Sequence, residues 1–198
     1  ANRTASTSAA VTQSVARATT ATTLTSSAAT TTFGQTITFT VAVTSPDGAL
    51  PAGSVALYDG TAGIGSCILP GTGTNTCTLA TSTLLSGTHS ITAAFADTAN
   101  HVGSSSTART QTVRASTSTV VASSSASVPY GQAVQFTMTV NSADGSVATG
   151  TITLSDGTAG LGTCTLTNGR CSILAPSLAG GSHSIVADRK STRLNSSH

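Results

Sequence analysis

Apolar and polar residues alternate along several short segments of the chain. The clearest segment places an apolar side chain at every second position, namely Ile37, Phe39, Val41 and Val43. Val55 and Leu57 alternate with Ser54 and Ala56 in the same way. Because successive side chains of a strand point to opposite faces, this period of two predicts β-strands with one apolar face and one threonine-rich face.

Turn-forming residues separate these segments. They occur at Pro46-Asp47-Gly48, Asp59-Gly60, Pro70-Gly71 and Ser86-Gly87, and such residues favour the backbone conformations of tight turns. The strands predicted between them cover 22–27, 35–45, 53–59, 63–69, 75–81, 88–96 and 107–113. Seven short strands in about 95 residues predict an immunoglobulin-like β-sandwich, in which two antiparallel sheets close over one core.

The sequence repeats itself at an offset of 97 residues. Residues 33–67 align with residues 130–164 without a gap and share 17 identities in 35 positions. After a loop that is three residues shorter, residues 84–93 align with residues 178–187 at an offset of 94. A period of nearly 100 residues is too long for a solenoid unit and is typical of tandem β-sandwich domains.

The N-terminal segment carries the end of the same pattern. Residues 1–15 align with residues 99–113 at an offset of 98, so we expect residues 1–19 to be the last strand of a preceding repeat in a longer protein. A complete domain is then expected at 20–114, and a second domain at 115–187 that is truncated before its last strand. The linker between them is only a few residues long, which restricts the movement of neighbouring domains.

The sequence departs from the repeat at Asp188. Residues 188–198 contain four charged residues in eleven positions, and their back-translation resembles a common sequencing adapter codon for codon. We therefore expect residues 188–198 to be an artefactual tail that lies outside the fold. The alternative is a genuine basic tail.

Composition narrows the class of protein. Only 7% of the residues are charged and the formal net charge is +2, so the chain lacks the dense basic face that a nucleic-acid partner requires. Abundant threonine and serine favour an all-β chain, with a disordered mucin-like stalk as the alternative. No apolar run reaches the ~18 residues of a spanning helix, so we expect no membrane span in this segment.

Four cysteines flank a short loop in each repeat. Four cysteines allow three pairings, and the repeat favours pairing within each domain, Cys67 with Cys77 and Cys164 with Cys171. The spacing predicts cross-strand partners in a hairpin. Zinc is the alternative, but the spacing contains no CxxC pair. Disulfides place the chain in an oxidising compartment, which is extracellular or at the cell surface.

The residues of a Ser/His/Asp site are present but are repeated. His89 and His183 occupy the same repeat position at the start of a strand. Because a catalytic residue is rarely duplicated in every copy of a module, we expect a structural role at the sandwich edge and no catalytic residue. His101 lies in a loop where the N-terminal segment has Arg3, which disfavours a metal site there.

The sequence evidence for metal and cofactor sites is also weak. Five aspartates are candidate calcium ligands at the domain ends, but four of them precede glycine, which turn formation explains; they are Asp47, Asp59, Asp97, Asp144 and Asp156. The glycines of DGTAGIG lack the lysine and helix of a phosphate loop. We therefore expect neither a metal nor a cofactor. A sugar-binding array of threonine hydroxyls remains an alternative, although aromatic platforms for stacking are scarce.

Several motifs together resemble a known family. The stretches FGQTITFTVAVTSPDG, GSVALYDG, GIGSCIL, CTLATSTLLSGTHSITAAF and ANHVGSSS are similar to the bacterial Ig-like repeat of group 3, and the resemblance covers residues 1–187. It implies tandem domains in large secreted or surface proteins, whose partners are neighbouring repeats of the same chain. It implies a non-enzymatic spacer or stalk. The alternatives are an adhesive module that binds a glycan or a host protein, and an accessory domain of a secreted hydrolase.

Overall fold

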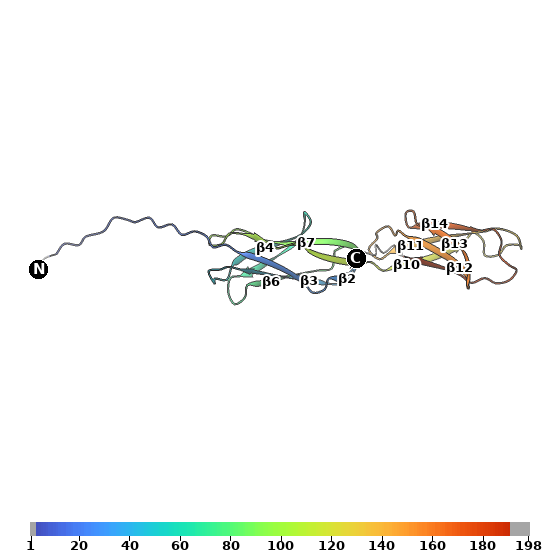
Figure 1. Cartoon of the computed structure of the whole chain (residues 1–198), viewed down its shortest axis with the longest axis horizontal. Helices are drawn as coiled ribbons and strands as arrows, with labels where there is room; N and C mark the ends of the chain where they lie inside the picture. Colours follow the sequence, from blue (N-terminus) through green and yellow to red (C-terminus); the bar gives the residue numbers. More distant parts are fainter. Residues whose placement is uncertain (1–2, 191–198) are drawn as a thin grey trace, which may run out of the picture. The chain divides into compact units, whose positions relative to one another are not determined.

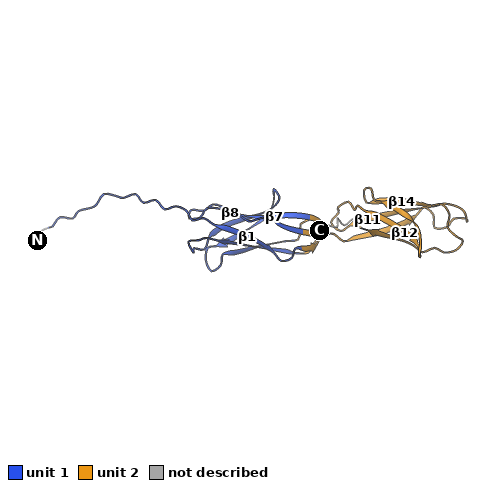
Figure 2. Cartoon of the chain, viewed as in Figure 1, with its two compact units in different colours: residues 1–29, 36–81, 88–111 blue, residues 30–35, 82–87, 112–198 orange. Residues whose placement is uncertain are grey.

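The computed structural model describes residues 3–190, and this part of the chain is all-β, without a helix (Figure 1). Within this part the chain forms two compact units (Figure 2), one of residues 3–29, 36–81 and 88–111 and the other of residues 30–35, 82–87 and 112–190. Residues 3–17 are exposed and form no strand. Their assignment to a preceding repeat stays a prediction.

One sheet of the first repeat has three antiparallel strands in the order β1-β3-β6. These strands are β1 (Ala21–Ser26), β3 (Ile37–Thr44) and β6 (Thr76–Thr81). The alternating segment at 37–43 forms β3, the central strand, where Ile37, Phe39, Val41 and Val43 are all buried in the sandwich. The period of two therefore predicts both the strand and the face that it buries.

The other sheet has the order β2-β9-β7-β4-β5, and β8 pairs with β7. Its strands are β2 (Thr30–Thr32), β4 (Ala52–Asp59), β5 (Ala62–Pro70), β7 (Gly87–Phe95), β8 (Ser104–Ser105) and β9 (Arg109–Arg114). β2 and β9 run parallel, with Thr31 opposite Val113. All other registered pairs between these strands are antiparallel.

The core of the first repeat lies between the two sheets. Its largest fully buried apolar side chains come from β3, β4, β5 and β7, namely Ile37, Phe39, Val41, Val43, Val55, Leu57, Leu69 and Ile91. Phe95, at the end of β7, is only 3% exposed. Burial of these apolar surfaces is the main favourable contribution to folding of a sandwich of this size.

The second repeat forms the same two sheets with fewer strands, in the orders β10-β11-β14 and β13-β12-β15. The strands are β10 (Thr117–Ser123), β11 (Val134–Ser142), β12 (Thr151–Asp156), β13 (Ala159–Thr165), β14 (Arg170–Ala175) and β15 (Ile185–Lys190). Its core includes Phe136, Met138, Ile152 and Leu154. Within residues 117–190 no strand corresponds to β2, β8 or β9.

The all-β fold class predicted from the sequence is confirmed, and the seven predicted strands of the first repeat are present with shifted ends. The short strands β2 and β8 were not predicted. β15 continues past the expected domain boundary at 187, since Asp188, Arg189 and Lys190 pair with β12. The domain boundaries stay predictions, and residues 191–198 of the expected tail lie outside the described residues.

Over residues 3–190, the chain contains no helix with the length and hydrophobicity needed to cross a membrane.

Candidate functional site

Each repeat contains one disulfide, Cys67–Cys77 in the first and Cys164–Cys171 in the second. These are the pairs that the repeat favours. The expectation that they are cross-strand partners in one hairpin is wrong, because β5 pairs with β4 whereas β6 pairs with β3. The chain crosses between the sheets in the intervening loop, and the disulfide therefore joins one sheet to the other.

A histidine and an aspartate meet at one edge of the first sandwich. His89 Nδ1 lies 2.6 Å from Asp59 Oδ2, and the other carboxylate oxygen of Asp59 accepts a hydrogen bond from the Ser90 amide. The Gly60 amide donates to the Ser90 carbonyl. These contacts tie the turn after β4 to the start of β7, so the pair fixes a corner of the sheet.

The second repeat builds the same corner. His183 Nδ1 lies 2.5 Å from Asp156 Oδ2, and the Ser184 amide donates to Asp156 Oδ1. His183 Nε2 lies 2.8 Å from the Ala179 carbonyl oxygen, which can only accept a hydrogen bond. Both ring nitrogens therefore have an oxygen acceptor, and Nε2 carries a proton that it donates to Ala179. An imidazole held in this way has no lone pair available to deprotonate a serine hydroxyl.

The sequence predicts that both histidines form hydrogen bonds at the sandwich edge, but it assigns Asp59 and Asp156 only to turns. The pairing joins residues about 30 positions apart, and only the strand register brings them together. One feature of the sequence could have indicated the contact between aspartate and histidine, because an Asp-Gly pair and a His-Ser pair occur together in both repeats.

The acceptors around His183 raise its pKa above the ordinary value, through the Ala179 carbonyl first and the Asp156 carboxylate second. The folded state therefore favours the protonated ring. This contribution to stability is complete below the unfolded pKa of about 6.5 and is lost as the pH rises through the higher folded pKa.

We predict that the free energy of unfolding of the second repeat falls when the pH is raised from about 5 to about 8, and that His183→Gln removes this dependence. Urea unfolding at several pH values, followed by the NMR signals of buried residues of the second repeat such as Ile152 and Leu154, measures it. A slope that persists in His183→Gln would assign the pH dependence to another group.

The aspartates considered as calcium ligands have their carboxylates in hydrogen bonds to nearby groups. Hydrogen bonds from the Ser142 hydroxyl and the Ser146 side chain lower the pKa of Asp144 well below its usual range. The Ser45 hydroxyl and the Ala49 amide lower the pKa of Asp47. No group of three potential metal ligands forms among residues 3–190.

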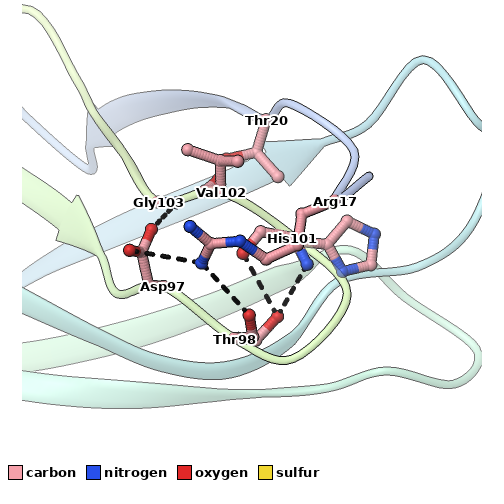
Figure 3. A network of polar contacts seen from close by, with 7 residues as sticks. All are labelled: Arg17, Thr20, Asp97, Thr98, His101, Val102 and Gly103. Atoms are coloured by element: carbon pink, nitrogen blue, oxygen red, sulfur yellow. Dashed lines mark hydrogen bonds and ion pairs between the residues drawn. The ribbon is translucent and has the colours of Figure 1, made fainter. Parts of the chain in front are cut away.

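A polar network surrounds the loop after β7 (Figure 3). The Asp97 carboxylate accepts a hydrogen bond from the Gly103 amide at 2.6 Å and forms an ion pair with Arg17 Nη1 at 3.2 Å. Both contacts lower the pKa of Asp97, and the hydrogen bond from Gly103 has the larger effect. Thr98 Oγ1 accepts a hydrogen bond from the His101 amide. His101 is only 6% exposed. The network fixes the loop and joins residue 17 to the first repeat.

Threonines form a row across the outer face of the sheet β1-β3-β6. The strand register places Thr40 opposite Thr25 on one side and opposite Thr78 on the other. The corresponding positions of the second repeat are Ala122, Thr137 and Ser172. The hydroxyl row is therefore incomplete in the second copy.

Comparison with protein families finds one match. A family described as bacterial Ig-like domain (group 3) matches residues 24–114 and again residues 120–190. No curated protein matches the chain.

Several solved structures resemble the chain. The fibronectin(III)-like modules of Clostridium thermocellum CbhA are 16% identical, with 84% of this chain and 85% of that chain covered and a TM-score of 0.35. A putative membrane anchored protein of Corynebacterium diphtheriae is 17% identical, with coverages of 68% and 34% and a TM-score of 0.37. A 1.5-MDa bacterial ice-binding adhesin is 16% identical, with coverages of 86% and 63% and a TM-score of 0.34.

Proposed function

Because the chain belongs to the bacterial Ig-like domain family of group 3, we propose that it is a non-enzymatic spacer within a bacterial secreted or cell-surface protein. In this role the repeats hold another module at a distance from the surface. What supports the proposal is a comparison of the two repeats, which share the features that maintain the sandwich and differ on its outer face.

The shared features are structural. Both repeats have an apolar core strand, an Asp–His corner and a disulfide that joins the sheets. The threonine row on the outer face differs, since it becomes Ala122, Thr137 and Ser172. A module whose role depends on its length and stability needs the shared structural features, and this role does not require the threonine row.

The connection between the repeats also suits a spacer. β9 ends at Arg114 and β10 begins at Thr117, so two residues join the two sandwiches. Linkers of this length allow much less freedom than a flexible chain. A nine-residue strand such as β5 spans about 30 Å, so the reach of such an array grows with the number of repeats.

The two disulfides support an extracellular or cell-surface location, because cytosolic reductants keep most thiols reduced. A charged fraction of 7% also leaves few sites for nonspecific electrostatic binding.

One observation favours a second candidate function, an adhesive module that binds a glycan. The row formed by Thr25, Thr40 and Thr78 presents three hydroxyl groups on one face of the first repeat. An adhesive module needs this threonine face to bind its glycan, whereas a spacer does not need it.

In the test, one end of the full chain is anchored to a cell surface and the other end carries a peptide epitope. The binding of an antibody to this epitope is then measured. As a spacer, the chain should keep the epitope accessible equally well with wild-type sequence and with Thr40→Asp, and the purified chain should give no signal on a glycan array. A glycan signal that disappears in Thr40→Asp would replace the spacer by the adhesive module. An epitope that stays equally accessible when both repeats are deleted would refute the spacer.

A further inference from the structure

One buried ring nitrogen of the first repeat has no hydrogen-bond partner. His101 lies in the loop between β7 and β8 and is only 6% exposed. Its Nε2 atom is shielded from solvent and finds no hydrogen-bond partner among residues 3–190. Burying a polar atom without a partner costs free energy, so the few such atoms of folded proteins commonly mark a bound water, an ion or a functional group. The groups that face Nε2 therefore indicate its role.

The Asp47 carboxylate faces this nitrogen from the turn between β3 and β4. Asp47 Oδ2 lies 3.6 Å from His101 Nε2, which is too long for a hydrogen bond between these atoms. The same two residue types do form a hydrogen bond elsewhere in the first repeat, where His89 Nδ1 lies 2.6 Å from Asp59 Oδ2. His101 and Asp47 are therefore neighbours that are spaced too widely to satisfy each other directly.

The separation instead suits two ligands of one metal ion. Zn²⁺ lies about 2.0–2.1 Å from an imidazole nitrogen and about 2.0–2.2 Å from a carboxylate oxygen, so two such ligands lie about 3.3–3.6 Å apart around one ion. Imidazole and carboxylate are both ordinary ligands of Zn²⁺, whereas Ca²⁺ takes oxygen ligands. The pair therefore favours a transition-metal ion over calcium.

Nearby contacts hold both side chains in place. The His101 amide donates to Thr98 Oγ1 at 3.0 Å, and the Thr98 amide donates to the His101 carbonyl at 2.9 Å. Asp47 Oδ1 accepts a hydrogen bond from the Ala49 amide at 3.0 Å, whereas Oδ2 is the oxygen that faces His101. The Ser45 hydroxyl first and the Ala49 amide second lower the pKa of Asp47, so its carboxylate is ionised at neutral pH. The Asp47 side chain is 41% exposed, so an ion can reach the pair from solvent.

We propose that His101 Nε2 and Asp47 Oδ2 bind one Zn²⁺ ion, with water at its remaining coordination positions. The ion would join the loop after β7 to the turn after β3. The same loop also holds the segment that enters the first repeat, because the Ala18 amide donates to the Asn100 carbonyl and the Val102 amide donates to the Ala18 carbonyl. Zinc would therefore stabilise the end of the first repeat at which the chain enters it. The inference goes beyond the spacer function and does not depend on it.

Nuclear magnetic resonance of the histidine rings tests the site in the full chain. Titration with ZnCl₂ should shift the Nε2 signal of His101, and CaCl₂ should not. Asp47→Asn should weaken zinc binding at His101 at least about 10-fold, because loss of a ligand costs no less than loss of a group that supports one. Asp144→Asn is the matched control, since Asp144 occupies the equivalent turn of the second repeat, where Ser142 and Ser146 donate hydrogen bonds to it. It should leave zinc binding at His101 unchanged.

Thermal unfolding of the first repeat supplies a second readout, followed by the NMR signals of the buried Leu57. An ion that binds only the folded state raises the midpoint of unfolding. Zinc should therefore raise this midpoint in the wild-type chain and in Asp144→Asn, but not in Asp47→Asn. His101→Gln should lose the response as well, and Asp47→Asn decides the question if His101→Gln does not fold, because Asp47 is more exposed.

Three results would each overturn the zinc site. The first is a His101 ring signal that zinc leaves unchanged, as expected if Nε2 carries a proton and donates it to Asp47 in solution. The second is an equal response of His101 to calcium. The third is an equal effect of Asp47→Asn and Asp144→Asn on zinc binding at His101.

Discussion

Replacing Phe95 with alanine is expected to lower the free energy of unfolding of the first repeat by about 3–5 kcal/mol, which removes most of the stability of a domain of this size. Phe95 is 3% exposed and lies opposite Val55. A Cβ atom at Gly53 would lie 3.1 Å from the Phe95 ring, which shows how closely the backbone approaches it. The alanine variant leaves a cavity in this contact.

Chemical denaturation followed by circular dichroism and by Tyr58 fluorescence measures the loss. The second repeat supplies a matched control, because Arg189 occupies the position of Phe95 and lies opposite Ile152. Its guanidinium donates hydrogen bonds to the exposed Thr149 carbonyl, so Arg189→Ala should cost less than about 1 kcal/mol. Similar losses for Phe95→Ala and Arg189→Ala would show that the aromatic ring is not the support of the first core.

Removal of one disulfide is expected to lower the stability of its own repeat by about 2–3 kcal/mol and to leave the other repeat unchanged. The Cys67–Cys77 pair encloses a longer loop than the Cys164–Cys171 pair, with separations of 10 and 7 residues. The longer loop loses slightly more entropy on closure, so the first repeat should lose slightly more stability.

Two paired variants test this expectation, Cys67→Ala with Cys77→Ala and Cys164→Ala with Cys171→Ala. Thermal unfolding of each variant is compared with that of the wild-type chain under a reducing agent, which should reproduce both losses together. Non-reducing peptide mapping identifies the pairs directly. A dominant disulfide between the two repeats would contradict the assignment.

Alternation made the central strands predictable. The pattern from Ile37 to Val43 requires one buried face, and a shift of one residue would expose all of these side chains. The repeat then transferred the same assignment to residues 134–140, where apolar residues alternate in β11. Glycine at the turns fixed the approximate strand ends, as at Gly60, which has a positive φ of 57°.

Other features depend on tertiary contacts that leave no local pattern. β2 and β8 consist of threonines and serines and have only two or three residues each, so no period exists to reveal them. The Asp59–His89 corner depends on the register between β4 and β7. The repeat favoured pairing of the cysteines within each domain, but whether a ten-residue separation forms a hairpin or crosses between sheets depends on the neighbours of each strand.

The parallel pair of β2 and β9 determines how a repeat responds to tension. β2 would be pulled from its N-terminal end and β9 from its C-terminal end, and because the strands run parallel these forces act in opposite directions along the same axis. The pairs Thr30–Thr112, Thr31–Val113 and Thr32–Arg114 are then loaded in shear. Their hydrogen bonds share the load and must break together, whereas a strand peeled from its edge loses them one at a time.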